Sequence, residues 1–98
     1  MTLDWHDEAS EEFSQAAIYY EQQYFGLGER FITHVDAAIA RLRAAPFMPR
    51  CFDGDCRKVR VEKFPYAIIY RIEQEKLQII ALMNLKRRPG YWKIRMDG

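Results

Sequence analysis

Residues 57–85 read RKVRVEKFPYAIIYRIEQEKLQIIALMNL and contain three segments rich in β-branched and aromatic residues. The segments span 57–64, 66–73 and 76–85, and they are separated by Pro65 and by the pair Gln74-Glu75. Residues of these types favour strands, and short breaks between strands favour antiparallel neighbours. The stretch therefore predicts a three-stranded antiparallel meander.

The sequence before the meander has the periodicity of two helices. Apolar residues recur every three or four positions, so each segment has one apolar face. The first face comprises Ala9, Phe13, Ala16, Ala17, Tyr20 and Tyr24, and the second comprises Phe31, Ile32, Val35, Ala38, Ile39 and Leu42. Gly26-Leu27-Gly28 allows the chain to reverse, and Pro46 ends the second helix because proline cannot continue the hydrogen-bond ladder. We expect a helical hairpin.

The remaining segments complete an α+β prediction. Residues 2–6 form a short first edge strand, and Asp7 offers a side-chain acceptor that caps the first helix. Residues 46–56 form a loop with a tight turn at Asp53-Gly54, and residues 91–96 form a short tail element. The expected fold is one domain over residues 1–98, in which a short N-terminal strand and a helical hairpin pack with an antiparallel sheet.

Length and composition exclude several classes of protein. The chain has 98 residues, of which 49% are hydrophobic and 30% charged, as in a single globular domain. It contains no apolar run of about twenty residues that could span a membrane. Its acidic start is unlike a signal peptide, so we expect a cytoplasmic protein.

Charge is unevenly distributed along the chain. Residues 1–56 carry four basic and ten acidic groups, a net charge of −6, whereas residues 57–98 carry eleven basic and four acidic groups, a net charge of +7. A basic half of this kind favours an anionic partner, such as nucleic acid or an acidic protein segment. The other interpretation is a solvated surface whose two halves attract each other weakly.

One face of the sheet lies beyond the reach of the helices. Strand alternation predicts that Ile69, Ile80 and Leu82 form an apolar floor on this face, bordered by Lys58, Arg60 and Arg71. An apolar floor with a charged rim is typical of a binding surface. Alternatively, residues 91–96 cover the floor, with Trp92 anchoring this tail in the core.

Metal binding and cofactors are not expected. Cys51 and Cys56 lie in the loop with four residues between them, but a zinc site needs four ligands, and His6 and His34 lie elsewhere. We expect two reduced thiols at the surface, and we interpret both histidines as surface groups. Tyr19, Tyr20 and Tyr24 could stack on bases, but their helical spacing favours packing against the sheet.

Four motifs, in this order, resemble the RelE/ParE superfamily of toxins, which includes plasmid stabilisation proteins. They are AAIYYE at 16–21, GLGERF at 26–31, FPYAIIY at 64–70 and KRRPGYW at 86–92. The resemblance implies two helices on an antiparallel sheet and a type II toxin-antitoxin system. It also implies a heteromeric complex in which the acidic and apolar tail of a cognate antitoxin wraps the toxin.

The resemblance leaves two targets open. RelE-like members cut messenger RNA on the ribosome, whereas ParE-like members inhibit DNA gyrase. The residues that would form an endoribonuclease site are Lys58, Arg60, Arg71, Arg87 and Tyr91, and those that would bind the antitoxin or target are Ile69, Ile80, Leu82, Arg87 and Arg88. Relatives that cleave RNA often have arginine where this chain has Ala67, and many relatives with an Arg-Xaa-Pro-Xaa-Tyr-Trp ending have histidine where it has Asn84. These departures favour gyrase, with ribonuclease activity or an inactive, antitoxin-binding protein as alternatives.

Overall fold

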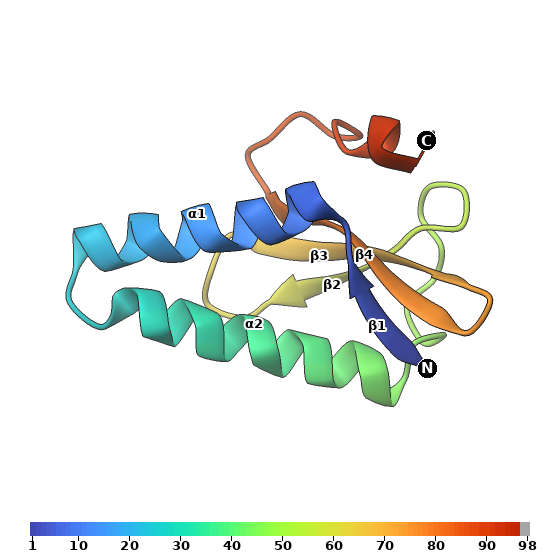
Figure 1. Cartoon of the computed structure of the whole chain (residues 1–98), viewed down its shortest axis with the longest axis horizontal. Helices are drawn as coiled ribbons and strands as arrows, with labels where there is room; N and C mark the ends of the chain where they lie inside the picture. Colours follow the sequence, from blue (N-terminus) through green and yellow to red (C-terminus); the bar gives the residue numbers. More distant parts are fainter. Residues whose placement is uncertain (97–98) are drawn as a thin grey trace.

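Two helices lie against one face of a four-stranded sheet in the computed structural model, which describes residues 1–96 (Figure 1). The elements are β1 (Thr2–Trp5), α1 (Asp7–Gln23), α2 (Leu27–Ala44), β2 (Arg57–Val61), β3 (Tyr66–Glu73), β4 (Lys76–Asn84) and the 3-10 helix η1 (Lys93–Met96). The α+β class and the helical hairpin are confirmed.

The predicted meander forms most of the sheet. The strand order is β1-β4-β3-β2, with antiparallel pairing between β2, β3 and β4. β1 pairs with β4 in the parallel direction along Lys76–Ile79, so the sheet is mixed. β2 ends at Val61 rather than at Phe64, because residues 62–65 form a turn in which Lys63 has a φ of 69°.

The first helix begins with a different cap from the one predicted. His6 is the N-cap, and its Nδ1 accepts a hydrogen bond of 3.1 Å from the backbone N–H of Glu8. Asp7 is instead the first residue of α1, because the backbone of His6 is still extended where β1 ends. A second difference concerns Tyr24. Its predicted place on the apolar face is wrong, because Tyr24 follows the last residue of α1 and is 71% exposed.

The turn between the helices is held by Glu21. Its carboxylate accepts hydrogen bonds of 3.0–3.1 Å from the backbone N–H groups of Gly26 and Gly28. Gly26 has a φ of 86°, which glycine adopts at little cost. At Gly28 a Cβ atom would lie 2.6 Å from the carbonyl oxygen of Ala17, so only glycine allows the two helices to approach this closely.

The main core lies between the helices and the sheet. Phe31 is its centre, packed edge-on against Phe64 and Tyr66 at ring-centroid distances of 5.1 Å. Ile68 and Tyr70 of β3 are fully buried in the same core, as strand alternation predicts.

A bulge in β4 changes which residues face the helices. Ala81 pairs with Ile69 and Ile79 pairs with Tyr70, which leaves Ile80 as an extra residue without an opposite partner. Beyond the bulge the alternation is shifted by one position. The predicted place of Leu82 on the floor is therefore wrong, since Leu82 packs in the main core on the helix side.

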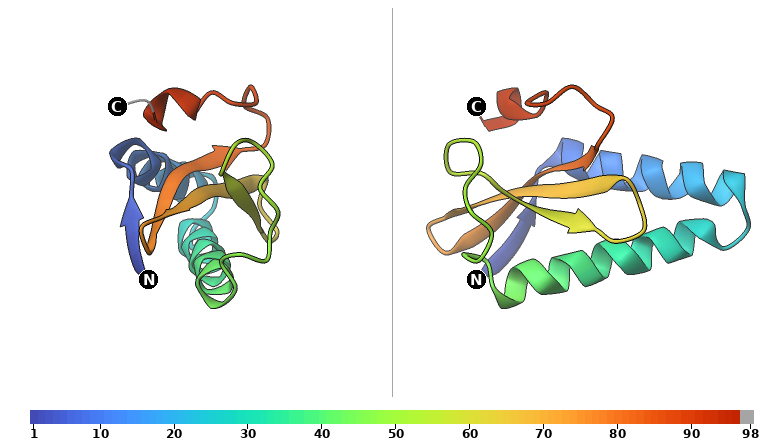
Figure 2. Two further views of the ribbon diagram at one scale, coloured as in Figure 1. Left: turned by 90° about the vertical axis from the view of Figure 1, so that its right-hand side faces the viewer. Right: turned by 180° about the vertical axis from the view of Figure 1, so that it is seen from behind.

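The C-terminal tail covers the opposite face of the sheet. Ile69 and Ile80 are buried in a second cluster together with Cys56, Ala81 and Trp92. The expectation of a surface thiol is therefore wrong for Cys56, whereas Cys51 is exposed. In both views of Figure 2 the C-terminal segment lies above the strands and α2 lies below them. The expectation of an exposed apolar floor is wrong, because the tail fills the space, as the alternative interpretation held.

We expect Trp92→Ala to lower the free energy of unfolding by about 3–5 kcal/mol, as large-to-small changes in a core do. Trp92 is 1% exposed and joins the tail to the sheet. Urea denaturation measures the change. Phe25→Ala is the control, because Phe25 is 92% exposed and its removal should change stability little. Equal stability of Trp92→Ala and the wild type would contradict this packing role.

Candidate functional site

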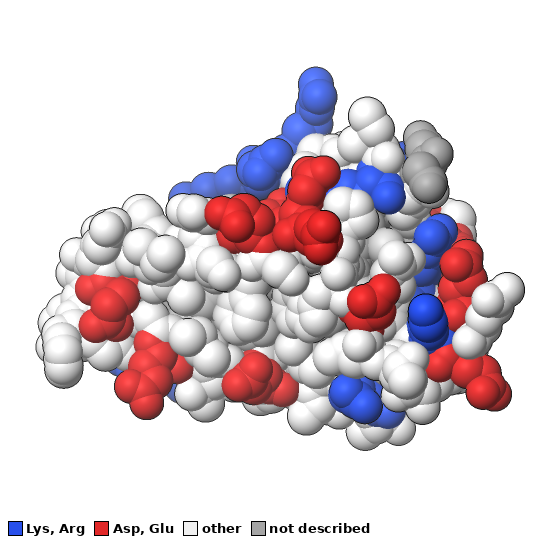
Figure 3. All heavy atoms as spheres, in the orientation of Figure 1, with Lys and Arg blue, Asp and Glu red and all other residues white. Residues whose placement is uncertain are grey.

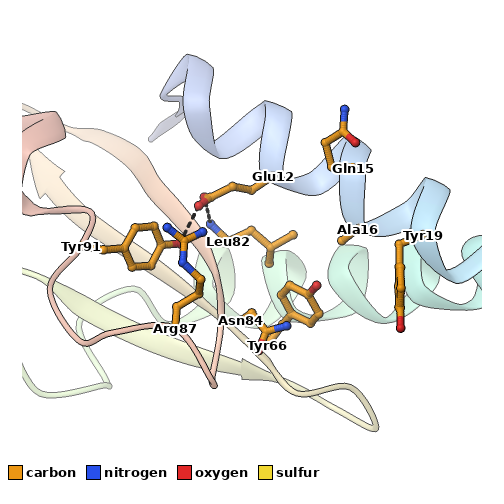
Figure 4. A pocket seen from close by; sticks show the side chains of 9 residues that line it. All are labelled: Glu12, Gln15, Ala16, Tyr19, Tyr66, Leu82, Asn84, Arg87 and Tyr91. Atoms are coloured by element: carbon orange, nitrogen blue, oxygen red, sulfur yellow. Dashed lines mark hydrogen bonds between the residues drawn. The ribbon is translucent and has the colours of Figure 1, made fainter.

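The tail is attached to α1 through the carboxylate of Glu12. Arg95 donates two hydrogen bonds to it, at 2.8 Å to Oε1 and 2.9 Å to Oε2. The hydroxyl of Tyr91 donates to Oε2 at 2.5 Å, and the backbone N–H of Leu82 donates to Oε1 at 3.1 Å (Figure 4). One side chain of α1 thus joins β4, the segment after β4, and η1.

This arrangement follows from the shortness of β1. β1 pairs with β4 only as far as Ile79, so the residues after Ile79 have no strand beside them on that edge. On this edge the Glu12 carboxylate accepts a hydrogen bond from the Leu82 N–H, and Arg95 donates one of 3.0 Å to the Ile80 carbonyl. The Arg95 side chain is 6% exposed, and a buried ion pair of this kind is tolerated because its hydrogen bonds are satisfied.

The network suppresses ionisation of Tyr91. Burial raises the pKa of the Tyr91 hydroxyl well above its usual range, and the hydrogen bond to Glu12 and its negative charge raise it further. The hydrogen bond to Glu12 likewise raises the pKa of Arg95. At neutral pH the Tyr91 hydroxyl therefore stays protonated and donates its hydrogen bond to Glu12.

Three exposed cations follow β4. Lys86, Arg87 and Arg88 form a segment that we term the basic turn. The guanidinium carbon of Arg87 lies 3.9 Å from the centroid of the Tyr91 ring, a cation–π distance, so the ring positions Arg87. No ion pair within residues 1–96 involves the basic turn. Lys and Arg side chains stand out along the upper margin in Figure 3, where this segment runs in Figure 1.

A pocket of about 280 Å³ opens between α1 and the end of β4. Figure 4 shows its walls, which combine aromatic rings, a cation and the carboxylate of the network. It is lined by Glu12, Gln15, Ala16, Tyr19, Tyr66, Leu82, Asn84, Arg87 and Tyr91. We term it the α1 pocket.

A second pocket, of about 360 Å³, lies on the tail side of the sheet. Lys58 and Arg87 both line it, together with Phe52 and Trp92. The Lys58 ammonium lies 4.8 Å from the Phe52 ring centroid, and Lys93 forms an ion pair of 2.8 Å with Asp53 beside it. We term it the tail pocket.

The predicted ribonuclease residues are only partly assembled. Lys58 and Arg87 share the tail pocket, and Arg87 contacts Tyr91. Arg60 is exposed on β2 and lines neither pocket. Arg71 lies farther along β3, where it donates to Gln78 at 2.9 Å and forms a 3.8 Å ion pair with Glu73.

The predicted contact residues also separate into two groups. Arg87 and Arg88 are exposed, as a contact surface requires. Ile69, Ile80 and Leu82 are buried, so a partner could reach them only after the tail or the helices had moved.

Sequence reasoning missed Glu12 and Arg95. A signal for Glu12 was present, since it lies three residues after Ala9 and four before Ala16, on the inner face of the helix. A carboxylate on an apolar face indicates a buried partner. No comparable signal marks Arg95, because its position depends on the path of the tail.

Comparison with known proteins gives the family. The model of the family described as ParE toxin of type II toxin-antitoxin system, parDE, matches residues 3–96. The chain belongs to the ParE toxin family. This confirms the resemblance that the four motifs carried.

The solved structures agree with this ParE-family fold. One of them is the chromosomal ParDE TA system from P. aeruginosa, which aligns with a TM-score of 0.65 at 14% sequence identity. The alignment covers 88% of this chain and 97% of that chain. A search of curated protein sequences gave no match. Among residues 1–96, no helix of this ParE-family chain has the length and apolarity to cross a membrane.

We expect Glu12→Ala to lower the free energy of unfolding by about 3–5 kcal/mol, since the buried Arg95 loses its 2.8 Å partner and keeps only the 3.4 Å ion pair with the exposed Glu8. Urea denaturation measures the loss. Glu11→Ala is the matched control, because the exposed Glu11 side chain accepts a hydrogen bond from Gln15 alone. A loss at Glu12 no larger than the loss at Glu11 would show that the tail is held by other contacts.

Alkaline pH should destabilise the fold through Cys56. Burial, together with the charge of Asp55, raises the pKa of this thiol from 9.0 to about 11. The unfolded thiol therefore ionises first, and the stability that is complete below pH 9.0 falls as the pH rises toward about 11. Chemical denaturation across this range should show a shallower fall for Cys56→Ala than for the wild type. Cys51→Ala, at the exposed cysteine, should retain the wild-type slope.

Proposed function

We propose that the protein is the toxin of a type II toxin-antitoxin pair, that it acts on DNA gyrase in the cytoplasm, and that a cognate antitoxin neutralises it. Family membership supports the toxin and the antitoxin. The similar structure is that of a ParDE TA system, which also supports an antitoxin partner. The choice of gyrase over RNA depends on one observation, the hydrogen bond from Tyr91 to Glu12.

That hydrogen bond disfavours a nuclease. Cleaving RNA without a metal needs a base for the 2′-hydroxyl and an acid for the leaving oxygen, each with a pKa near the working pH. The hydroxyl proton of Tyr91 is donated to Glu12, and burial raises the pKa of the hydroxyl. Ala67 and Asn84 supply no ionisable group, and Arg71 is bound to Gln78 and Glu73.

The basic turn is the surface that we assign to the target. Its cations are exposed and form no ion pair within the described residues, so their charge is available to a macromolecule. Arg87 is also held in place by Tyr91, which reduces the side-chain entropy lost on binding. Arginine presented in this way is a frequent hot spot of protein interfaces.

A ribosome-dependent endoribonuclease is the second candidate. Lys58 and Arg87 face one tail pocket, where two cations could hold a phosphate. If this function is the correct one, simultaneous replacement of Lys58, Arg60 and Arg71 by Ala abolishes cleavage. A third candidate, a protein that only binds its antitoxin, predicts neither inhibition nor cleavage.

We expect the double variant Arg87→Ala, Arg88→Ala to inhibit gyrase supercoiling about tenfold less than the wild type, as the loss of a hot spot implies. Arg30→Ala is the matched control, because Arg30 is exposed on α2. A parallel assay follows messenger RNA on programmed ribosomes. Cleavage there without gyrase inhibition would favour the second candidate, and no effect in either assay would favour the third.

Expression without antitoxin tests the same choice in cells. Pulse labelling in the first minutes should show DNA synthesis failing before protein synthesis. The reverse order would contradict gyrase as the target.

A further inference from the structure

β4 has a free edge beyond the end of β1. The pairing with β1 stops at Ile79, and the Leu82 N–H points away from β3, toward Glu12. Because successive residues of a strand direct their backbone N–H and C=O groups to opposite sides, those of Ile80 and Asn84 also point to this edge. A free strand edge is a template for an added strand.

The tail occupies only part of the edge. Arg95 donates a hydrogen bond to the Ile80 carbonyl, and Glu12 accepts one from the Leu82 N–H. The Asn84 carbonyl accepts a hydrogen bond of 2.9 Å from the N–H of Arg87. The Leu82 carbonyl and the Asn84 N–H remain: by the alternation they point to the same edge as the Leu82 N–H, away from β3, and no turn or loop bond of residues 1–96 involves them. In a parallel pair, the residue opposite Met83 would satisfy both groups: its N–H would donate to the Leu82 carbonyl and its carbonyl would accept from the Asn84 N–H. The remaining pair therefore suits a strand parallel to β4, the direction that β1 already has.

Side chains of such a strand would enter the α1 pocket. Residues flanking the one opposite Met83 point to the helix side, where Leu82 and Asn84 line the pocket. The carboxylate of Glu12 is already occupied by Arg95, Tyr91 and Leu82. The charge left in the pocket is that of Arg87 (Figure 4). Lys86 and Arg88 adjoin Arg87 in the sequence. The complementary side chain is therefore acidic.

We propose that the free edge of β4 binds an extended acidic segment of the antitoxin, which adds a strand parallel to β4 and places a carboxylate against Arg87. The inference rests on the proposed function for the identity of the partner. It also explains neutralisation, because a segment bound there covers Arg87 and hides the basic turn from the target.

Amide hydrogen exchange on the toxin, alone and in complex with its cognate antitoxin, tests the added strand. The Asn84 amide should exchange about tenfold or more slowly in the complex, because it gains a hydrogen bond there. The Leu82 amide, already bonded to Glu12, should change much less and serves as the internal reference. An Asn84 amide that exchanges equally fast in both states would overturn the proposal.

Charge reversal tests the carboxylate. Arg87→Glu should weaken antitoxin binding about tenfold or more by calorimetry, whereas Arg30→Glu, an equal charge change on α2, should leave it unchanged. Equal binding by both variants would also overturn the proposal. So would slow Asn84 exchange in the free toxin accompanied by dimers in size-exclusion chromatography, since a second copy would then occupy the edge.

The two proposals fail separately. Gyrase inhibition with unaltered Asn84 exchange in the complex would leave the proposed function standing and remove only the added strand. If exchange of the Asn84 amide slows in the complex but the toxin does not inhibit gyrase, the added strand stands and gyrase is rejected as the target. Absence of any complex with the antitoxin would reject both the partner and the strand.

Discussion

The carboxylate of Glu12 is the point on which the C-terminal half of the structure depends. A carboxylate on the inner face of a helix is costly unless its oxygens receive hydrogen bonds. Here it receives four, from Leu82, Tyr91 and twice from Arg95. These bonds fix where the tail crosses the sheet, so they also determine that Trp92 covers Ile69 and Ile80.

The shortness of β1 explains why this network is needed. Had β1 continued past Trp5, a strand would have covered the edge that Glu12 and Arg95 now occupy. Its end at His6 instead lets α1 begin early and brings Glu12 opposite Leu82. The same shortness leaves part of the edge open beside Arg87. One boundary in the sequence thus determines the tail path and the only stretch of β4 edge, within residues 1–96, that the fold does not fill.

Local sequence patterns predicted the helices and strands well. The features that sequence reasoning missed depend on tertiary structure. The period of two in residues 66–73 and the glycines at 26 and 28 specify structure within a few residues, so β3 and the hairpin turn follow from sequence. The bulge at Ile80 does not, because it depends on pairing with β3, and it moved Leu82 to the helix face. Glu12 and Arg95 lie more than eighty positions apart, and their contact exists only once the tail is placed.

The charge asymmetry of the chain acquires a structural meaning from this arrangement. Glu12 of the acidic half forms hydrogen bonds and an ion pair with Arg95 of the basic half, whereas Arg87 forms no ion pair within residues 1–96. The Tyr91 ring contacts both arginines: Arg95, which is buried and joins the tail to Glu12, and Arg87, which is exposed to solvent. Because the ring is fixed by Glu12, the position of the exposed arginine is set by a residue of α1. In the proposed function, the hydrogen bond from Tyr91 to Glu12 therefore acts twice: it holds the ring against which Arg87 packs, and together with burial it raises the pKa of the Tyr91 hydroxyl, which disfavours Tyr91 as an acid-base group.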